Sequence, residues 1–271
     1  MCELFAMSSS EPTTLKYSLD EFSRNGSKLR NNRDGWGIAM ARDRDVILVK
    51  EPEPATDSIW VRFIADNAIE TDTAIAHVRY ATRGVHTMEN THPFRRALGR
   101  RTQVFAHNGT LAGIFDGIDV ASLAYEPIGE TDSELAFCTL LTRIAPLYAG
   151  DERPTVDARF DAFAAFCDEM MAFGNGNFLY YDGDVLFAHG HRRVYEEGGE
   201  HTEPKPPGLQ IKKCWSCAAQ NEIHSPGLDM ELRDQQTVLF ASVPLDEDGW
   251  EPLDEGAVVA VKAGKILRES T

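Results

Sequence analysis

The sequence predicts an α+β fold in which antiparallel sheets pack against segregated helices. Six β-rich runs are grouped towards the two ends of the chain, and two helical stretches lie between them. This order lacks the regular alternation of strand and helix that parallel βαβ units require. A chain of 271 residues is long enough to bury a large core. We therefore expect one domain over residues 2–271, with the weakest pattern in 190–235.

The first half of the chain supplies three of the β-rich runs and one short helix. The runs are DVILVK (45–50), TAIAHVRY (73–80) and TQVFAHNG (102–109). They are rich in the β-branched and aromatic residues that strands favour. A short helix over 57–68 is expected after the turn EPEPATD.

Two stretches in the middle of the chain, 132–145 and 158–173, have apolar residues at helical spacing. Apolar side chains recur there at i, i+3, i+4 and i+7, which lines one face of an α-helix. They are Phe137, Leu140, Leu141 and Ile144 in the first stretch and Phe163, Phe166, Cys167 and Met170 in the second. In TDSE (131–134), Thr131 as N-cap and Glu134 at N3 predict a capping box that starts the first helix.

The last part of the chain predicts two hairpins, one further strand and a loop. The β-rich runs are NFLYYDGDVLFAH (177–189), TVLFASVPL (237–245) and GAVVAVKAGKILR (256–268). Asp-Gly and Ala-Gly between apolar runs are typical of hairpin turns. The polar, proline-rich segment 196–208 predicts a loop.

Composition narrows the class of protein. The 27 basic and 43 acidic side chains give a net charge of −16, which repels nucleic acid and anionic membranes. No run approaches 18 consecutive apolar residues, and the N-terminus lacks the features of a signal peptide. Five cysteines favour a reducing cytoplasm over a disulfide framework. We therefore expect a cytoplasmic protein that binds neither nucleic acid nor membrane.

Three polar motifs could carry chemistry, and each also has a plain structural interpretation. In DGWG (34–37), the glycines around Trp36 allow either close approach of the backbone to a ligand or a tight turn with a packed ring. In HVRYATRG (77–84), Arg79 is either a surface residue or a clamp for a carboxylate. In AHNGT (106–110), Asn108 and Gly109 form either a turn or two convergent donors for an oxyanion.

Two further motifs carry weaker signals. The capping box in TDSE leaves Asp132 free to point away from the helix. CWSC (214–217) is a single CxxC pair, formed by Cys214 and Cys217. Without a second pair or a well-spaced histidine, it is weak evidence for zinc. No metal and no cofactor are therefore expected.

Cys2 follows Met1 directly, and this position suggests how the thiol could be activated. If Met1 is removed, Cys2 carries both a thiol and a free α-amine. The reference pKa of such an amine is about 7.7–8.0, and that of a thiol is about 8.5. The amine can therefore take the proton of the thiol near neutral pH and later deliver it to a leaving amine. Nucleophile and base would then belong to one residue.

In this order and spacing, the motifs resemble those of the class II glutamine amidotransferases, which are N-terminal-nucleophile (Ntn) hydrolases. The matching set is Cys2, DGWG, HVRYATRG, NTHPF (90–94), FAHNGT and TDSE. The later segments FLYYDGDVLFAHG and ASVPLDEDGWEP look closest to the small stand-alone YafJ-like members. The resemblance implies a four-layer αββα sandwich of two antiparallel sheets flanked by helices.

The resemblance also implies roles for the residues that perform the reaction. Cys2 would be the nucleophile that forms a γ-glutamyl thioester, with its own α-amine as the base. Asn108 and Gly109 would build the oxyanion hole. No cofactor is implied.

A second group of residues would hold the glutamyl part of the substrate. Arg79, helped by Thr82, would bind the α-carboxylate, and Asp132 would pair with the α-ammonium. Tyr80 and Trp36 complete the expected substrate-binding set. The synthases of the family tend to have Trp at the position of Tyr80 and His at that of Arg83, so specificity beyond the glutamyl group stays open.

The residues leave three functions open. Cys2 could release ammonia from glutamine for a separate acceptor protein, because the last predicted strand pair ends near residue 268 and leaves no acceptor domain. It could instead hydrolyse the γ-glutamyl amide of a larger compound, such as a γ-glutamyl peptide. The third alternative is a non-catalytic scaffold with a CxxC thiol or metal site. Competent residue types at all the catalytic positions favour an enzyme.

Overall fold

A computed structural model describes most of the chain. The described residues are 2–17, 34–55, 58–67, 69–79, 85–214, 222–225, 228–231, 235–245 and 247–270. The helices among them are α2 (Ile59–Asn67), α3 (Ile114–Gly117), α4 (Asp132–Ile144) and α5 (Val156–Met171), with 3-10 turns at Val120–Ser122 and Ala145–Tyr148. None of these helices is long and apolar enough to cross a membrane.

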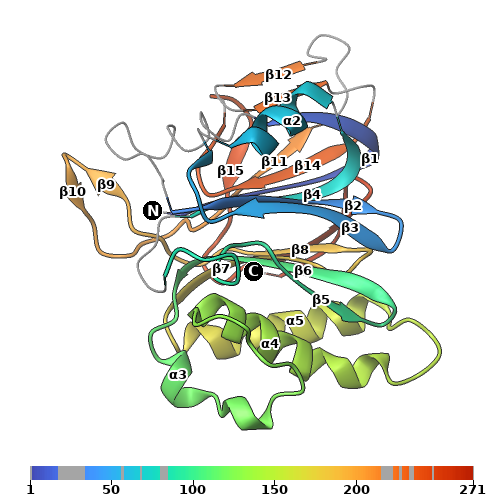
Figure 1. Cartoon of the computed structure of the whole chain (residues 1–271), viewed down its shortest axis with the longest axis vertical. Coiled ribbons are helices and arrows are strands. Elements are labelled where there is room, and N and C mark those ends of the chain that lie inside the picture. Colours follow the sequence, from blue (N-terminus) through green and yellow to red (C-terminus); the bar gives the residue numbers. More distant parts are fainter. Residues whose placement is uncertain are drawn as a thin grey trace.

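Two antiparallel sheets form the body of the molecule (Figure 1). The first has the order β15 (Trp250–Pro252), β11 (Gln210–Cys214), β14 (Thr237–Ala241), β1 (Glu3–Tyr17), β4 (Glu70–Val78), β2 (Trp36–Arg42) and β3 (Asp45–Glu51), with β13 (Leu228–Glu231) also paired to β1 and β12 (Glu222–Ser225) paired to β13. The second has the order β17 (Lys265–Ser270), β16 (Val258–Lys262), β8 (Leu186–His189), β7 (Asn175–Tyr181), β6 (Arg101–Thr110) and β5 (Phe94–Leu98). A small hairpin joins β9 (Glu196–Glu197) to β10 (Glu200–His201).

The sheets stack face to face, and helices cover their outer faces (Figure 1). Helices α4 and α5 lie under the second sheet, and α2 lies over the first. This arrangement confirms the predicted α+β sandwich of two antiparallel sheets. Strand β1 contributes to two core layers, since Leu4 and Ala6 pack between the sheets while Phe5 and Met7 pack on the outer face. Side-chain alternation along a strand produces this division.

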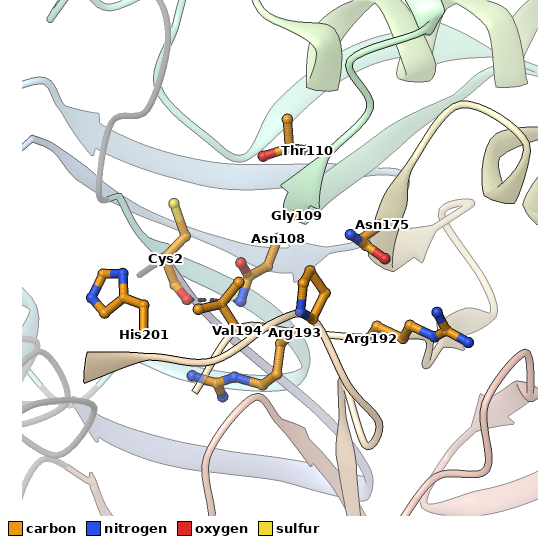
Figure 2. Close-up of a pocket in the computed structure, with 10 residues that line it drawn as sticks. Cys2, Asn108, Gly109, Thr110, Asn175, Arg192, Arg193, Val194 and His201 are labelled. Atoms are coloured by element: carbon orange, nitrogen blue, oxygen red, sulfur yellow. Dashed lines mark hydrogen bonds between the residues drawn. The ribbon is translucent and has the colours of Figure 1, made fainter. Parts of the chain in front are cut away.

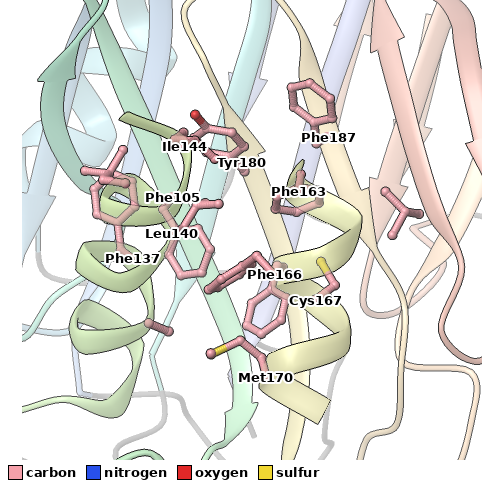
Figure 3. Close-up of a cluster of buried hydrophobic side chains, with 14 of the residues drawn as sticks. Phe105, Phe137, Leu140, Ile144, Phe163, Phe166, Cys167, Met170, Tyr180 and Phe187 are labelled. Atoms are coloured by element: carbon pink, nitrogen blue, oxygen red, sulfur yellow. The ribbon is translucent and has the colours of Figure 1, made fainter. Parts of the chain in front are cut away.

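Phenylalanines dominate the layer between the second sheet and its helices (Figure 3). Phe105 of β6 stacks on Phe137 of α4, with their ring centroids 5.3 Å apart. Phe163 of α5 packs on Tyr180 of β7 at 5.5 Å and on Phe187 of β8 at 5.4 Å. Burial of such rings removes a large apolar area from water and fixes the two helices on the sheet.

The predicted elements are confirmed with small shifts at their ends. The helices predicted over 57–68, 132–145 and 158–173 are α2, α4 and α5, and the two predicted hairpins are β7–β8 and β16–β17. The predicted loop 196–208 contains the short strands β9 and β10. Strand β1 was not predicted, because both faces of its first part, residues 3–9, are buried and its sequence lacks the polar–apolar alternation of a half-exposed strand.

Candidate active site

Cys2 directly precedes β1, and strand pairing fixes its surroundings. Glu3 is in register with Val78 of β4, and Phe5 is in register with Ala241 of β14. By alternation, Cys2 belongs to the same face as Leu4, which points towards the second sheet. Cys2 is half-buried. Its thiol therefore lies at the end of the space between the two sheets.

Asn108 comes from the second sheet and contacts Cys2. Its Nδ2 donates to the carbonyl oxygen of Cys2 at 2.7 Å and to Oγ of Ser242 at 3.2 Å. Ser242 Oγ also accepts from the backbone N–H of Leu4 at 3.1 Å. The Asn108 amide is thus held beside the cysteine, and Ser242 ties Asn108 and Leu4 to the end of β14.

The backbone at position 109 accommodates only glycine. Its φ is +152°, and a Cβ added there would lie 2.0 Å from the carbonyl oxygen of Asn175. The absence of a side chain lets β6 and β7 stay paired up to Thr110 while the backbone next to Asn108 remains open. The sequence motif AHNGT therefore has a strict conformational requirement.

A cavity of about 270 Å³ lies beside Cys2 (Figure 2). One part of its lining is Cys2, Asn108, Gly109, Thr110 and Asn175, and the rest is Arg192, Arg193, Val194, His201 and Pro204. The first group comes from the N-terminus and the end of β6–β7. The second comes from the segment that carries the β9–β10 hairpin.

Asn177 joins the two parts of this lining. Its buried side chain donates to the carbonyl oxygen of Asn108 at 3.0 Å and to that of Arg192 at 2.9 Å. Its Oδ1 accepts from the backbone N–H of His191 at 2.7 Å. The wall segment is also closed on itself by two backbone hydrogen bonds between Arg193 and Lys205. The cavity is therefore built from fixed contacts.

Arg79 follows β4 and lies near Cys2. Its backbone N–H donates to the carbonyl oxygen of Gly35, and its Nη1 lies 3.4 Å and 3.3 Å from the carbonyl oxygens of Asp34 and Val85. Burial lowers the pKa of Arg79, while the charges of Cys2 and Asp34 oppose that shift. The guanidinium and the thiol are thus electrostatically linked.

Asp132 is the first residue of α4. Its Oδ2 accepts from the backbone N–H of Leu111 at 2.7 Å, and its Oδ1 accepts from that of Ser133 at 2.9 Å. The predicted N-cap is confirmed, since Thr131 Oγ1 accepts from the N–H of Glu134 at 3.2 Å. The Glu134 carboxylate instead accepts from the N–H groups of residues 128 and 129 and pairs with Arg96. Through its hydrogen bond with Leu111, the carboxylate of Asp132 is attached to the segment that follows Gly109.

Buried histidines surround this end of the molecule. The rings of His77 and His92 lie 4.2 Å apart, and Nδ1 of His107 lies 2.8 Å from Oγ of Ser133. Burial lowers the pKa of His77 to about 3 and that of His189 to about 3. These imidazoles are therefore neutral near pH 7.

Glu3 is buried on the opposite face of β1 from Cys2. Burial raises the pKa of its carboxyl group to about 7, and the charges of Arg193 and of the chain terminus oppose that shift. Its Oε2 has no hydrogen-bond partner within the described part of the chain. A second titratable group thus lies next to Cys2 on the other face of β1.

Of the remaining predicted site residues, Trp36 is not brought to the cavity. Trp36 is fully buried in the outer core layer, and its Nε1 donates to Glu51 at 3.1 Å. These surroundings support the interpretation of DGWG as a tight turn with a packed Trp36 ring. Tyr80 and Thr82 lie outside the described residues, as does Cys217. No group of three or more His, Cys, Asp or Glu side chains that could hold a metal occurs in the part that the structure describes.

The fold is an α+β sandwich of the Ntn-hydrolase kind, and comparison with known proteins identifies the family. A family model described as "Glutamine amidotransferases class-II" matches residues 1–271. The chain belongs to this family, and it is an enzyme of the amidohydrolase and amidotransferase type.

Individual relatives agree with this assignment. YafJ of Escherichia coli, which is named as a glutamine amidotransferase, is 35% identical over 189 residues, which make up 70% of this chain and 72% of that protein. An uncharacterized protein of Methanocaldococcus jannaschii is 30% identical over 98% of this chain and 71% of its own length. A crystal structure of a predicted glutamine amidotransferase from Pseudomonas aeruginosa superposes with a TM-score of 0.72 at 29% identity, covering 98% of this chain and all of that one.

A more distant structure shares the fold. The glutamine phosphoribosylpyrophosphate amidotransferase of Bacillus subtilis has a TM-score of 0.59 at 14% identity, with 99% of this chain and 49% of that chain covered. At this identity the likeness concerns the sandwich alone.

Several residues that build the cavity were not predicted from the sequence. Asn177 begins a predicted β-rich run and Ser242 lies within another, and both side chains are buried. His201 lies in the segment predicted as a loop and carries no local motif. Its place in the cavity depends on the long return of the chain from β8 to β11.

Proposed function

We propose that Cys2, freed by removal of Met1, is the nucleophile that cleaves the γ-glutamyl amide of glutamine or of a larger γ-glutamyl compound. The observation that carries this proposal is the cavity that Cys2 shares with Asn108 and Gly109, residues more than a hundred positions away in the sequence. We also propose that residues 2–271 act as one domain, since β1 pairs with both β4 and β14.

The first half of the reaction forms a thioester. The α-amine of Cys2 takes the thiol proton, and the sulfur attacks the γ-carbonyl carbon. The negative charge that develops on the carbonyl oxygen is stabilised by Asn108 and the backbone N–H of Gly109. For Asn108 this requires an Nδ2 hydrogen to leave its present partner, and the contact with Ser242 is the longer of the two. The C–N bond then breaks, and the leaving amine takes the proton from the α-ammonium.

The second half of the reaction releases glutamate. The α-amine takes a proton from a water molecule, whose oxygen attacks the thioester carbon. The C–S bond breaks, and the sulfur recovers its proton from the α-ammonium. Substrate amide and water are thereby converted into glutamate and an amine, or into glutamate and ammonia when the substrate is glutamine.

Arg79 and Asp132 are proposed to bind the two charges at the α-carbon of the glutamyl group. The zwitterion needs one cationic and one anionic partner, and both residues adjoin the Cys2 region through β4 and the Leu111 backbone. Thr82 and Tyr80 stay part of the proposed substrate-binding set. The carboxylate of Asp132 keeps acceptor capacity beyond its two backbone hydrogen bonds.

Two fates of the released amine remain distinct proposals. Ammonia from glutamine could pass to a separate acceptor protein, or the amine of a larger γ-glutamyl amide could be released to solvent. The cavity next to Cys2 is larger than ammonia requires, and this favours the second. Family membership favours either enzyme over a scaffold built around Cys214 and Cys217.

The test compares wild type with Cys2→Ala after mass spectrometry has verified removal of Met1. We expect glutamine and γ-glutamyl amide hydrolysis to fall about a thousandfold or more in Cys2→Ala, because the nucleophile is lost. Cys214→Ala, which removes another half-buried thiol, serves as the matched control and keeps activity. The proposal fails if processed wild type neither turns over any γ-glutamyl substrate nor forms a Cys2 adduct with a glutamine-mimicking electrophile.

A further inference from the structure

The cavity beside Cys2 faces the part of the substrate that leaves. Its lining includes the nucleophile and the proposed oxyanion donors, but neither Arg79 nor Asp132. A glutamyl group held by those two residues has its α-carbon end outside the cavity. The space bounded by residues 192–204 is then left for the group on the other side of the scissile C–N bond.

The cavity is much larger than an ammonia molecule. A molecule of that size, like water, occupies roughly 30 Å³ in a liquid. The cavity has about 270 Å³. Val194 and Pro204 give its wall an apolar component, as in sites for organic ligands. An amine with several carbon atoms fits this space, and ammonia alone leaves most of it unfilled.

The described lining of the cavity contains two arginines and one histidine and no acidic side chain. These residues are Arg192, Arg193 and His201, in a protein whose net charge is −16. Arg192 is neutralised by Glu255, whose Oε1 lies 2.5 Å from its Nε. Arg193 is nine-tenths buried and donates to the carbonyl oxygen of Ser242, but it forms no ion pair with any residue that the structure describes.

Two further features bear on the polarity of the cavity. Arg193 interacts electrostatically with the buried carboxyl group of Glu3, and burial raises the pKa of that carboxyl to about 7. His201 supplies an imidazole N–H, which is a donor in either tautomer. His201 and Cys2 both line the cavity, as Asn175 does (Figure 2). A basic wall of this kind complements a carboxylate.

We infer that this cavity binds the amine portion of the substrate and selects γ-glutamyl amides whose amine carries a carboxylate. Such compounds are γ-glutamyl amino acids and short γ-glutamyl peptides. The assignment presupposes the proposed role of Cys2 as nucleophile. In the reaction the γ-glutamyl C–N bond breaks, and the amino acid leaves with a proton from the Cys2 α-ammonium. Water then hydrolyses the thioester to glutamate.

The first experiment tests the size of the subsite. Val194→Trp fills the cavity, and we expect the ratio of kcat/KM for γ-glutamyl-alanine to kcat/KM for glutamine to fall at least tenfold. The ratio is measured within one sample, so partial misfolding does not affect it. Val120→Trp, at an exposed valine that does not line the cavity, keeps the wild-type ratio within about twofold. An unchanged ratio in Val194→Trp overturns the assignment.

The second experiment tests the charge of the subsite. γ-Glutamyl-alanine and γ-glutamyl-ethylamide differ only in the carboxylate of the amine. We expect wild type to prefer the former about tenfold in kcat/KM, and His201→Gln to lower this preference at least threefold. Lys205→Gln removes a basic residue of the same segment that does not line the cavity, and it keeps the preference. Equal turnover of the two substrates by wild type, or an undiminished preference in His201→Gln, overturns the assignment.

The outcomes also separate this assignment from the proposed function. If wild type hydrolyses glutamine but shows no preference for amides whose amine carries a carboxylate, the proposed Cys2 mechanism stands and only the subsite assignment is overturned. Wild type with Met1 removed that hydrolyses no γ-glutamyl substrate overturns both.

Discussion

The helix-facing side of the second sheet has two ends of opposite character. At one end, Tyr180 and Phe187 pack against Phe163 of α5. At the other end, His107 of β6 and His189 of β8 occupy the same face beside Phe178 of β7. The strands and the sheet face are shared, and only the chemistry of the side chains changes.

This difference separates stability from the candidate site. The phenylalanine end removes apolar area from water, which favours folding. The histidine end buries imidazoles that lose hydration, and it lies next to Asn108 and Gly109 in β6. The polar end thus bears an energetic penalty that the apolar end offsets. Three predictions test this division.

The largest effect is expected at the apolar end. Phe163→Ala removes a fully buried ring, and we expect the free energy of unfolding to fall by about 3–5 kcal/mol. Urea denaturation measures it. Phe115→Ala is the matched control at an exposed phenylalanine and should cost less than about 1 kcal/mol. The folded Phe163→Ala enzyme should keep its kcat/KM. A large stability loss from Phe115→Ala alone would contradict the division.

An intermediate effect is expected from the buried histidines. The pKa of His189 is lowered to about 3 in the folded chain, chiefly by burial, against about 6.5 when unfolded. Between these values the unfolded state binds a proton that the folded state does not. The stability from neutral His189 is therefore complete above pH 6.5 and is lost progressively as the pH falls towards 3.

His189→Phe extends the apolar end and removes this titration. Between pH 7 and pH 5, wild type should lose about 2 kcal/mol more stability than His189→Phe, as measured by urea unfolding at both pH values. The raised pKa of Glu3 acts in the opposite direction, but it cancels in the difference between the two proteins. The same pH dependence in wild type and His189→Phe would show that His189 titrates normally.

The apolar end could be predicted from the sequence far better than the polar end. Phe163, Phe166 and Met170 recur at helical spacing, and this local signal survives in α5. Glu134 shows the limit of local reasoning, because its carboxylate binds Arg96 and two loop N–H groups rather than closing the capping box. The meeting of Cys2 with Asn108 is entirely non-local. Only the likeness of the ordered motifs to a known family predicted it.

The smallest effect is expected from Ser133, which connects the two features of the polar end. Its Oγ lies 2.8 Å from Nδ1 of His107 and 3.3 Å from Oδ1 of Asp132. Ser133→Ala leaves the buried His107 nitrogen unpaired, so we expect unfolding to become easier by about 1–2 kcal/mol. Ser122→Ala, at an exposed serine, should cost less than about 0.5 kcal/mol.

Ser133→Ala also tests whether the Ser133 hydroxyl positions the carboxylate of Asp132. The two backbone hydrogen bonds to Asp132 remain in this variant, so its carboxylate stays near Leu111 while losing the contact with the Ser133 hydroxyl. If Asp132 binds the α-ammonium, KM for glutamine should rise a few-fold while kcat changes little, since the nucleophile and the oxyanion donors are untouched. Ser133→Thr, which keeps the hydroxyl, should restore KM. A fall in kcat at constant KM would instead link the His107–Ser133 pair to the chemical step.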